Sequence, residues 1–209
     1  MSIRVYSLIV NVAIAVAVLA AWGGMMFAAN ERGALVAHGL SSLRYFTVLS
    51  NLLACAGSAV YAVCLARLLR GSAAAVPQWA VVLKYAGAVS VALTFLTVVL
   101  FLGPTAKDGF CSMFLGSNLW FHLIVPLLAV ADFCFLNPDG PLPFASSFLA
   151  CVPMALYAVY YLANILAVGP EKGDWYGFLR GGVPMGAAIS AINFLGTWGL
   201  ALLLRLTHR

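Results

Sequence analysis

Charged residues are scarce in this sequence. Of its 209 residues only 8% are Asp, Glu, Lys or Arg, whereas a soluble domain carries about a quarter. Hydrophobic residues make up 64%, and the mean hydropathy is +1.04. Because a soluble fold of this length could not remove so much apolar surface from water, the composition excludes a soluble globular domain.

Runs of basic residues are absent too, although the formal net charge is +5. Lys and Arg are scattered at the ends of apolar segments, whereas a nucleic-acid-binding protein gathers them on one face. We therefore expect no nucleic-acid partner.

Metal-binding patterns are also missing. The three histidines, His38, His122 and His208, lie in different regions, and no acidic or cysteine residue stands at ligand spacing from them. The five cysteines show no CxxC spacing and are expected to be small packing residues. We expect no metal ion and no other cofactor.

Long apolar runs fill nearly the whole chain instead. Each has about 20 residues, enough for a helix to cross a hydrocarbon core of about 30 Å. They lie at Ser7–Ala29, Leu43–Ala66, Gln78–Leu102, Leu115–Leu136, Ser146–Val168 and Val183–Leu206. The first run is too long for a signal peptide and lacks a clear cleavage site. The sequence predicts an all-α polytopic membrane protein, a single domain of six transmembrane helices over residues 1–209.

Charge, glycine and proline positions indicate how these helices are arranged. Six of the 11 Lys and Arg residues fall on the side of both termini, which favours cytoplasmic termini by the positive-inside rule. Glycine pairs in the last run, Gly182 with Gly186 and Gly196 with Gly199, predict a close approach to a neighbouring helix. Pro126 removes a backbone donor and predicts a kink that frees the carbonyl of His122.

Polar side chains inside the predicted helices share one depth. Alternate helices run in opposite directions, so Thr47 and His122 both lie roughly 6 to 11 Å below the boundary of the hydrocarbon core on the side away from the termini. We call this side the outer side. The same level holds Arg44, Ser50, Asn51, Asn118, Tyr160, Tyr161 and Asn164, and the loop 169–182 adds Asp174, Trp175 and Tyr176 above it. We treat all ten as candidate substrate-binding residues.

Asp132 lies apart from this layer. It follows His122 by ten residues, which places it about 15 Å deeper. A carboxylate inside a membrane needs a partner, and we expect Lys84 or Arg67 to pair with it near the inner boundary.

Thr47 and His122 together offer a nucleophile and a base. Asn51, Asn118 or Arg44 stand near enough in the pattern to orient the base or to stabilise an oxyanion. A purely structural interpretation competes with this one, because intramembrane histidines are often hydrogen-bonded packing residues and threonine hydroxyls often bond their own helix.

Three segments of the chain, in order, resemble a known family. They are Arg44-Tyr-Phe-Thr-Val-Leu-Ser-Asn51, then His122-Leu-Ile-Val-Pro126 with Asp132 after it, then Gly173-Asp-Trp-Tyr-Gly-Phe178. Together they resemble the androgen-induced FAR-17a-like family of six-helix membrane proteins. The match is closest to the bacterial branch of that family, which implies a location in a bacterial plasma membrane.

The resemblance implies an activity. Animal members are threonine hydrolases that cleave fatty acid esters of hydroxy fatty acids with an intramembrane threonine and a histidine. The matching segments carry these roles onto Thr47 and His122, and they imply a membrane lipid or lipid-like ester as the substrate, with its acyl chain between helices.

Two alternatives remain open. In a small-molecule carrier or channel, Arg44, His122, Asp132 and Lys84 would line a path across the bilayer. A non-enzymatic lipid-binding protein would instead show a closed, well-packed layer in which Thr47 and His122 are too far apart to share a hydrogen bond.

Overall fold

The computed structural model describes residues 2–27, 37–137 and 139–208, and this part of the chain is helical with no strands. Six helical spans are long and apolar enough to cross a membrane, so the protein is an integral multi-pass membrane protein. The spans are α1 (Ile3–Phe27), α2 (Phe46–Leu69), α3 (Gln78–Thr97, extended by a π-helical segment to Leu102), a composite fourth span (Ser117–Leu136), α6 (Ser146–Val168) and α8 (Gly182–Thr207).

The fourth span changes helical type along its length. It contains α4 (Ser117–Leu119), a π segment (Trp120–Ile124), α5 (Val125–Ala131) and a second π segment (Asp132–Leu136). The described loops contain three short helices. Two are 3₁₀ turns, at Gly39–Arg44 and Phe110–Phe114, and the third is the four-residue α7 at Pro170–Gly173.

The six spans expected from the sequence are confirmed, with small shifts at their ends. The first helix begins at Ile3 rather than Ser7, and its expected end at Ala29 lies outside the described residues. The second begins at Phe46 rather than Leu43, because the preceding residues form the 3₁₀ turn. Gly169, with a positive φ of 81°, ends α6, and its N–H caps the carbonyl of Ile165 at 2.9 Å.

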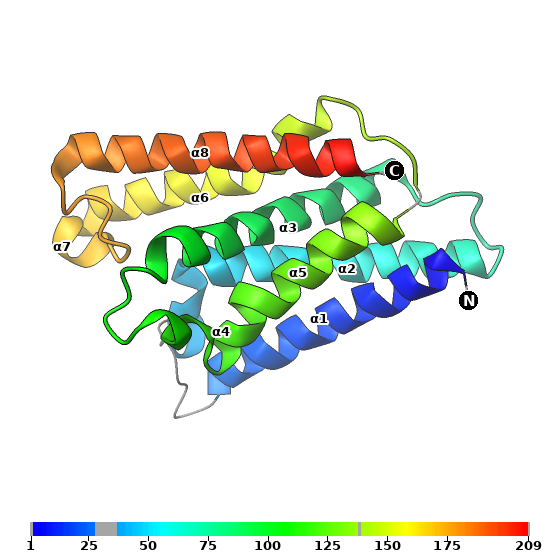
Figure 1. Cartoon of the computed structure of the whole chain (residues 1–209), viewed down its shortest axis with the longest axis horizontal. Helices are drawn as coiled ribbons and strands as arrows, with labels where there is room; N and C mark the ends of the chain where they lie inside the picture. Colours follow the sequence, from blue (N-terminus) through cyan, green and yellow to red (C-terminus); the bar gives the residue numbers. More distant parts are fainter. Residues whose placement is uncertain (1, 28–36, 138, 209) are drawn as a thin grey trace.

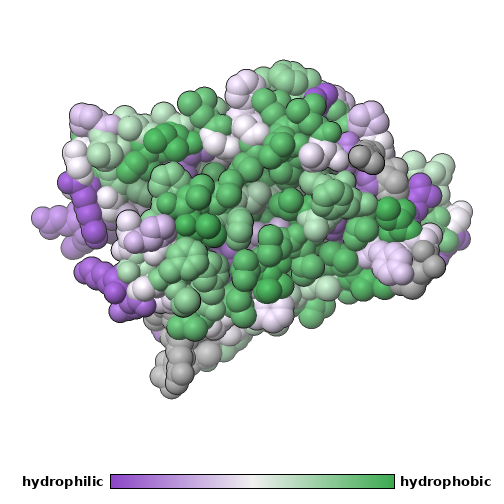
Figure 2. Space-filling model, viewed as in Figure 1, coloured by the Kyte–Doolittle hydropathy of each residue, from purple (hydrophilic) through white to green (hydrophobic). Residues whose placement is uncertain are grey.

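The most buried span, α3, lies at the centre of the bundle (Figure 1). On one side α6 and α8 run next to each other, and α1 and α5 lie on the opposite side. The two ends of the chain lie at one end of the bundle, and α7 lies at the other, which is the outer end. Figure 2 shows hydrophobic side chains over the middle of one face and hydrophilic side chains at its two ends, as a lipid-facing surface requires.

Small residues bring helices together, but not where the sequence pattern predicted. Gly196 and Gly199 face open space, and a side chain at Gly186 would meet Leu179 of the preceding loop rather than another span. The prediction of a close helix pair at these glycines is therefore wrong within this chain. The close pair is α2 with α3, where a Cβ on Gly57 would lie 3.0 Å from the Cα of Lys84 and one on Gly87 would lie 2.8 Å from the Cα of Ala54.

Candidate active site

Thr47 and His122 line one cavity at the outer end of the bundle. The cavity has a volume of about 290 Å³, and loop residues complete its wall, among them Tyr45, Thr105, Met113, Trp175 and Tyr176. Thr47 is in the first turn of α2 and His122 in the π segment of the fourth span. Thr47 is 8% exposed and His122 is 3% exposed, whereas Thr105 at the rim is exposed. The cavity therefore connects two buried polar side chains with the outer surface.

The imidazole of His122 is oriented by a backbone carbonyl. Its Nδ1 lies 2.7 Å from the carbonyl oxygen of Met113, in the loop turn Phe110–Phe114. A carbonyl only accepts, so Nδ1 carries the proton and the neutral ring keeps its lone pair on Nε2. The orienting group is thus Met113 rather than the predicted Asn51, Asn118 or Arg44, because the loop folds back over the start of the span.

No hydrogen bond joins Thr47 Oγ1 to His122 among the residues that the structure describes. The backbone carbonyl of Thr47 is engaged, since it accepts from Ser50 Oγ at 3.1 Å and from Asn51 Nδ2 at 2.7 Å. Its side-chain hydroxyl has no partner within the described protein. Nucleophile and base in a ligand-free enzyme are often separated in this way and come together only around a substrate.

The helical distortion expected at Pro126 takes the form of the π segment. The N–H of Val125 bonds the carbonyl of Trp120, five residues back, so the next carbonyl in the same register, that of Phe121, faces Pro126. Proline has no N–H to offer. The carbonyl of Phe121 therefore lacks a helical partner, one residue before the His122 carbonyl that the sequence predicted from an α register.

Asn51 supplies the missing donor. Its Nδ2 bonds the carbonyl of Phe121 at 3.1 Å and the carbonyl of Thr47 at 2.7 Å. Asn51 is completely buried. One side-chain amide thus links the turn that carries Thr47 to the residue beside His122, and it holds the two segments in register.

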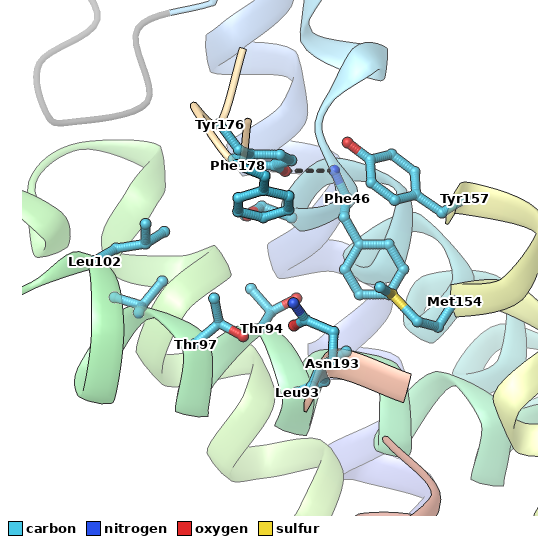
Figure 3. Close-up of a pocket in the computed structure, with 12 residues that line it drawn as sticks. Phe46, Leu93, Thr94, Thr97, Leu102, Met154, Tyr157, Tyr176, Phe178 and Asn193 are labelled. Carbon is cyan, nitrogen blue, oxygen red and sulfur yellow. Dashed lines mark hydrogen bonds between the residues drawn. The ribbon is translucent and has the colours of Figure 1, made fainter. Parts of the chain in front are cut away.

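A second, smaller cavity adjoins the first. It has a volume of about 50 Å³ and shares Thr47, Leu102 and Tyr176 with the His122 cavity. Figure 3 shows Thr94 and Thr97 of α3 on one side of it, Phe46 and Met154 on the other, and Asn193 between them. Thr47 therefore stands between the two cavities.

The loop between α6 and α8 forms the roof of the site. Tyr176 accepts a hydrogen bond from the N–H of Phe46 at 2.9 Å, which satisfies the first donor of α2 (Figure 3). Asp174 holds this loop in shape, because it accepts from Tyr161 Oη and, at 2.8 Å each, from the N–H groups of Phe178 and Leu179. Burial raises the pKa of Asp174, but these hydrogen bonds outweigh it and leave the pKa below its ordinary value.

The other candidate residues lie at various distances from the two cavities. Arg44 is exposed and donates to Tyr45 Oη at 2.7 Å, so its charge points to the outer surface. Ser50 contacts Thr94 Oγ1 at 2.9 Å in the helix interface. Asn118 is completely buried, and its amide has no partner in the described protein. Asn164 lies against α7, where a Cβ on Gly173 would be 3.1 Å from its Nδ2.

The tyrosines of α6 pack around the loop. Tyr161 is buried and contacts Trp175, with ring centroids 4.9 Å apart. Tyr160 is 45% exposed and lines a separate groove between α2 and α6. Tyr157, which accepts from Trp175 Nε1 at 3.2 Å, donates to the carbonyl of Arg44 at 2.8 Å.

Two wall residues have no clear signal in the sequence. Met113 acts through its backbone, which no side-chain pattern reveals. Asn193 lies in the last helix, 11 residues into α8, and its side chain reaches the cavity at Thr94 and Thr97 (Figure 3). A single asparagine in a long apolar run was the only available sign of it.

A second polar cluster lies deep in the inner half of the bundle. Lys84 forms an ion pair with Asp132, and the two are 4% and 0% exposed. Asn11 Nδ2 donates to Asp132 at 2.7 Å, and Lys84 Nζ lies 3.7 Å from the centroid of the Tyr61 ring. The pairing predicted for Asp132 is confirmed for Lys84. We call Asn11, Tyr61, Lys84 and Asp132 the inner cluster.

Over residues 2–27, 37–137 and 139–208, no three His, Cys, Asp or Glu side chains are grouped so that they could hold a metal ion. The chain matches no protein-family model, no curated protein and no solved structure.

Proposed function

We propose that this protein is an intramembrane hydrolase of lipid esters, with Thr47 as the nucleophile and His122 as the general base. The observation that carries the proposal is the shared cavity, which is lined both by a hydroxyl without a partner among the described residues and by an imidazole whose Nδ1–H is held by Met113. The resemblance to the androgen-induced FAR-17a-like family supports the proposal through the same two residues, and it extends the proposed substrates to fatty acid esters of hydroxy fatty acids. A bacterial plasma membrane with both termini in the cytoplasm belongs to the same proposal.

The chemistry follows the order of a serine hydrolase. His122 Nε2 accepts the proton of Thr47 as Oγ1 attacks the ester carbonyl carbon, and the tetrahedral intermediate collapses when the alkoxide leaves with that proton. Water then attacks the acyl-threonine while Nε2 again accepts a proton. Fatty acid is released, and Thr47 is regenerated. Water can enter past Thr105, at the exposed rim of the cavity.

Hydrolysis of para-nitrophenyl esters, from acetyl to palmitoyl, by the purified protein tests this proposal. Thr47→Ala and His122→Ala should each lower the rate at least about a hundredfold, the usual effect of removing a positioned nucleophile or base. Thr105→Ala is the matched control, because Thr105 lines the same cavity but donates to the backbone carbonyl of Phe101 at 2.9 Å. A Thr47→Ala protein as active as the wild type would falsify the assignment.

The alternatives find less support. A carrier would need Lys84 and Asp132 on a path, but neither lines any cavity described here. The lipid-binding alternative expected a closed layer around Thr47 and His122, and they share a cavity instead, although no hydrogen bond joins them. Under that alternative, the wild-type protein binds esters without hydrolysing any in the assay above.

A further inference from the structure

A large apolar cavity lies between α6 and α8, on the lateral face of the bundle that these two helices form. Its volume is about 450 Å³. Val159 of α6 and Val183 of α8 line it and are 67% and 76% exposed, so the cavity opens sideways. In a membrane this opening faces lipid rather than water.

Small side chains on the facing helices create the space. Ala158 lies on α6, and Gly186, Ala187 and Ser190 lie on α8. The hydroxyl of Ser190 donates to the carbonyl of Gly186 at 2.9 Å, so it offers the cavity no unpaired proton. The wall is therefore suited to a hydrocarbon chain and offers little to a polar ligand.

The depth of the cavity limits what can fill it. From Val183 to Asn193 the lining spans ten residues of α8, or about 15 Å along the helix axis. This is roughly the outer half of the hydrocarbon core. At that level water is scarce, and lipid acyl chains are the molecules available to enter.

The cavity adjoins the site at Thr47. Four residues, Met154, Tyr157, Phe178 and Asn193, line both this cavity and the smaller one that contains Thr47 (Figure 3). The smaller cavity shares Thr47 itself with the His122 cavity. The three cavities therefore lie in a row, from the lipid-facing opening to the hydroxyl of Thr47.

We infer that the cavity between α6 and α8 is the acyl-chain site of the protein. The chain of a single lipid ester enters sideways from the surrounding leaflet, and its carbonyl end passes Asn193 to reach Thr47. The ester oxygen and the leaving group then lie on the side of His122 and the outer surface. This inference rests on the proposed function for the reaction at the carbonyl, but the site can be tested by binding alone.

Photo-crosslinking tests the site without requiring hydrolysis. The purified protein in lipid nanodiscs is exposed to a palmitoyl ester that carries a diazirine in its alkyl chain, and labelled residues are mapped by peptide mass spectrometry. We expect label on α6 and α8 near Ala158 and Ala187, competed by excess unlabelled palmitoyl ester. Thr47→Ala should keep this label, because the cavity does not need the nucleophile.

A matched pair of variants sharpens the test. Ala187→Phe fills the cavity and should lower labelling about tenfold, because displaced methylenes lose their burial. Ala188→Phe adds the same ring at the neighbouring exposed position, which does not line the cavity, and should leave labelling unchanged. In hydrolysis, Ala187→Phe should slow the palmitoyl ester and spare the acetyl ester.

Two outcomes overturn the inference. One is label spread evenly over lipid-facing residues of all spans and not reduced by competitor. The other is label confined to the groove between α2 and α6, around Leu49 and Leu156. If the label maps to α6 and α8 but no protein hydrolyses esters, the acyl-chain site stands and the proposed function fails.

Discussion

The polar side chains at the level of Thr47 and His122, which we call the outer layer, and the inner cluster both lie inside the membrane, yet their polar groups are used differently. In the inner cluster, Lys84 and Asp132 are opposite charges that satisfy each other, with Asn11 as a further donor. In the outer layer, the hydroxyl of Thr47 has no partner among the described residues, and only one nitrogen of His122 has one there. Both of these side chains line a cavity, and the inner pair lines none of the cavities described.

The difference separates polar residues that pair with each other from polar residues that line a cavity, and the proposed reaction requires the second kind. Burial alone does not, because all four side chains are buried. What distinguishes Thr47 and His122 is that their unpaired atoms share a cavity with access to the outer surface. The inner cluster should accordingly matter for stability and the outer layer for chemistry.

Breaking the inner pair should have the largest effect on stability. Asp132→Asn leaves the charge of Lys84 buried without its counter-ion, and we expect a loss of about 3–5 kcal/mol in the free energy of unfolding. Thermal and denaturant unfolding in detergent measure it. The double variant Lys84→Met with Asp132→Leu removes both charges and should recover most of the loss.

The matched comparison is Thr47→Ala, which removes a hydroxyl that no protein atom binds. Its unfolding free energy should change by less than about 1 kcal/mol. Equal destabilisation by Asp132→Asn and Thr47→Ala would remove the contrast between the two regions.

A smaller loss of stability is expected when the side-chain amide of Asn51 is removed, which joins the turn that carries Thr47 to the segment that carries His122. Asn51→Leu leaves the carbonyls of Thr47 and Phe121 without this donor, at a cost of about 1–3 kcal/mol. It should also slow ester hydrolysis, because the spacing between Thr47 and His122 is no longer fixed. Asn193→Leu serves as the stability control, since Asn193 Nδ2 donates only within its own helix, to the carbonyl of Ile189. A stable and fully active Asn51→Leu protein would show that the two hydrogen bonds of Asn51 do not position Thr47 relative to His122.

The smallest effect concerns how the stability of the loop between α6 and α8, which forms the roof of the site, depends on pH. The pKa of Asp174 is lower in the folded protein than its ordinary value, so its contribution to loop stability is present above about pH 4 and is lost as the pH falls through the lowered pKa. Hydrogen exchange of the N–H groups of Phe178 and Leu179 should therefore accelerate in acid. In Asp174→Asn the exchange should already be fast at neutral pH and should lack this acid-dependent step. Identical pH profiles in the two proteins would contradict the role of Asp174.

The sequence was sufficient for the spans and for the depth of the polar residues. Hydropathy placed all six helices, and the rise of 1.5 Å per residue was enough to bring Thr47 and His122 to one level and Asp132 to another. The same geometry left Lys84 and Arg67 as possible partners of Asp132, because a buried carboxylate must find a partner, and the structure selects Lys84.

Other features depend on contacts that a one-dimensional pattern does not contain. The π register at His122 leaves the carbonyl of Phe121 without a helical partner, and only the helix geometry reveals this. Met113 contributes a backbone oxygen, which every residue possesses. Glycine spacing in α8 had the form of a packing motif, but the chain uses Gly57 and Gly87 to bring helices together.

The most direct test of the proposed mechanism is the position of the covalent adduct that the wild-type protein forms with a long-chain fluorophosphonate, read by peptide mass spectrometry. We expect one adduct on Thr47, lost in Thr47→Ala and His122→Ala and retained in Thr105→Ala and in the double variant of Lys84 and Asp132. Equal labelling of the Thr47→Ala protein, or an adduct on another residue, would contradict it.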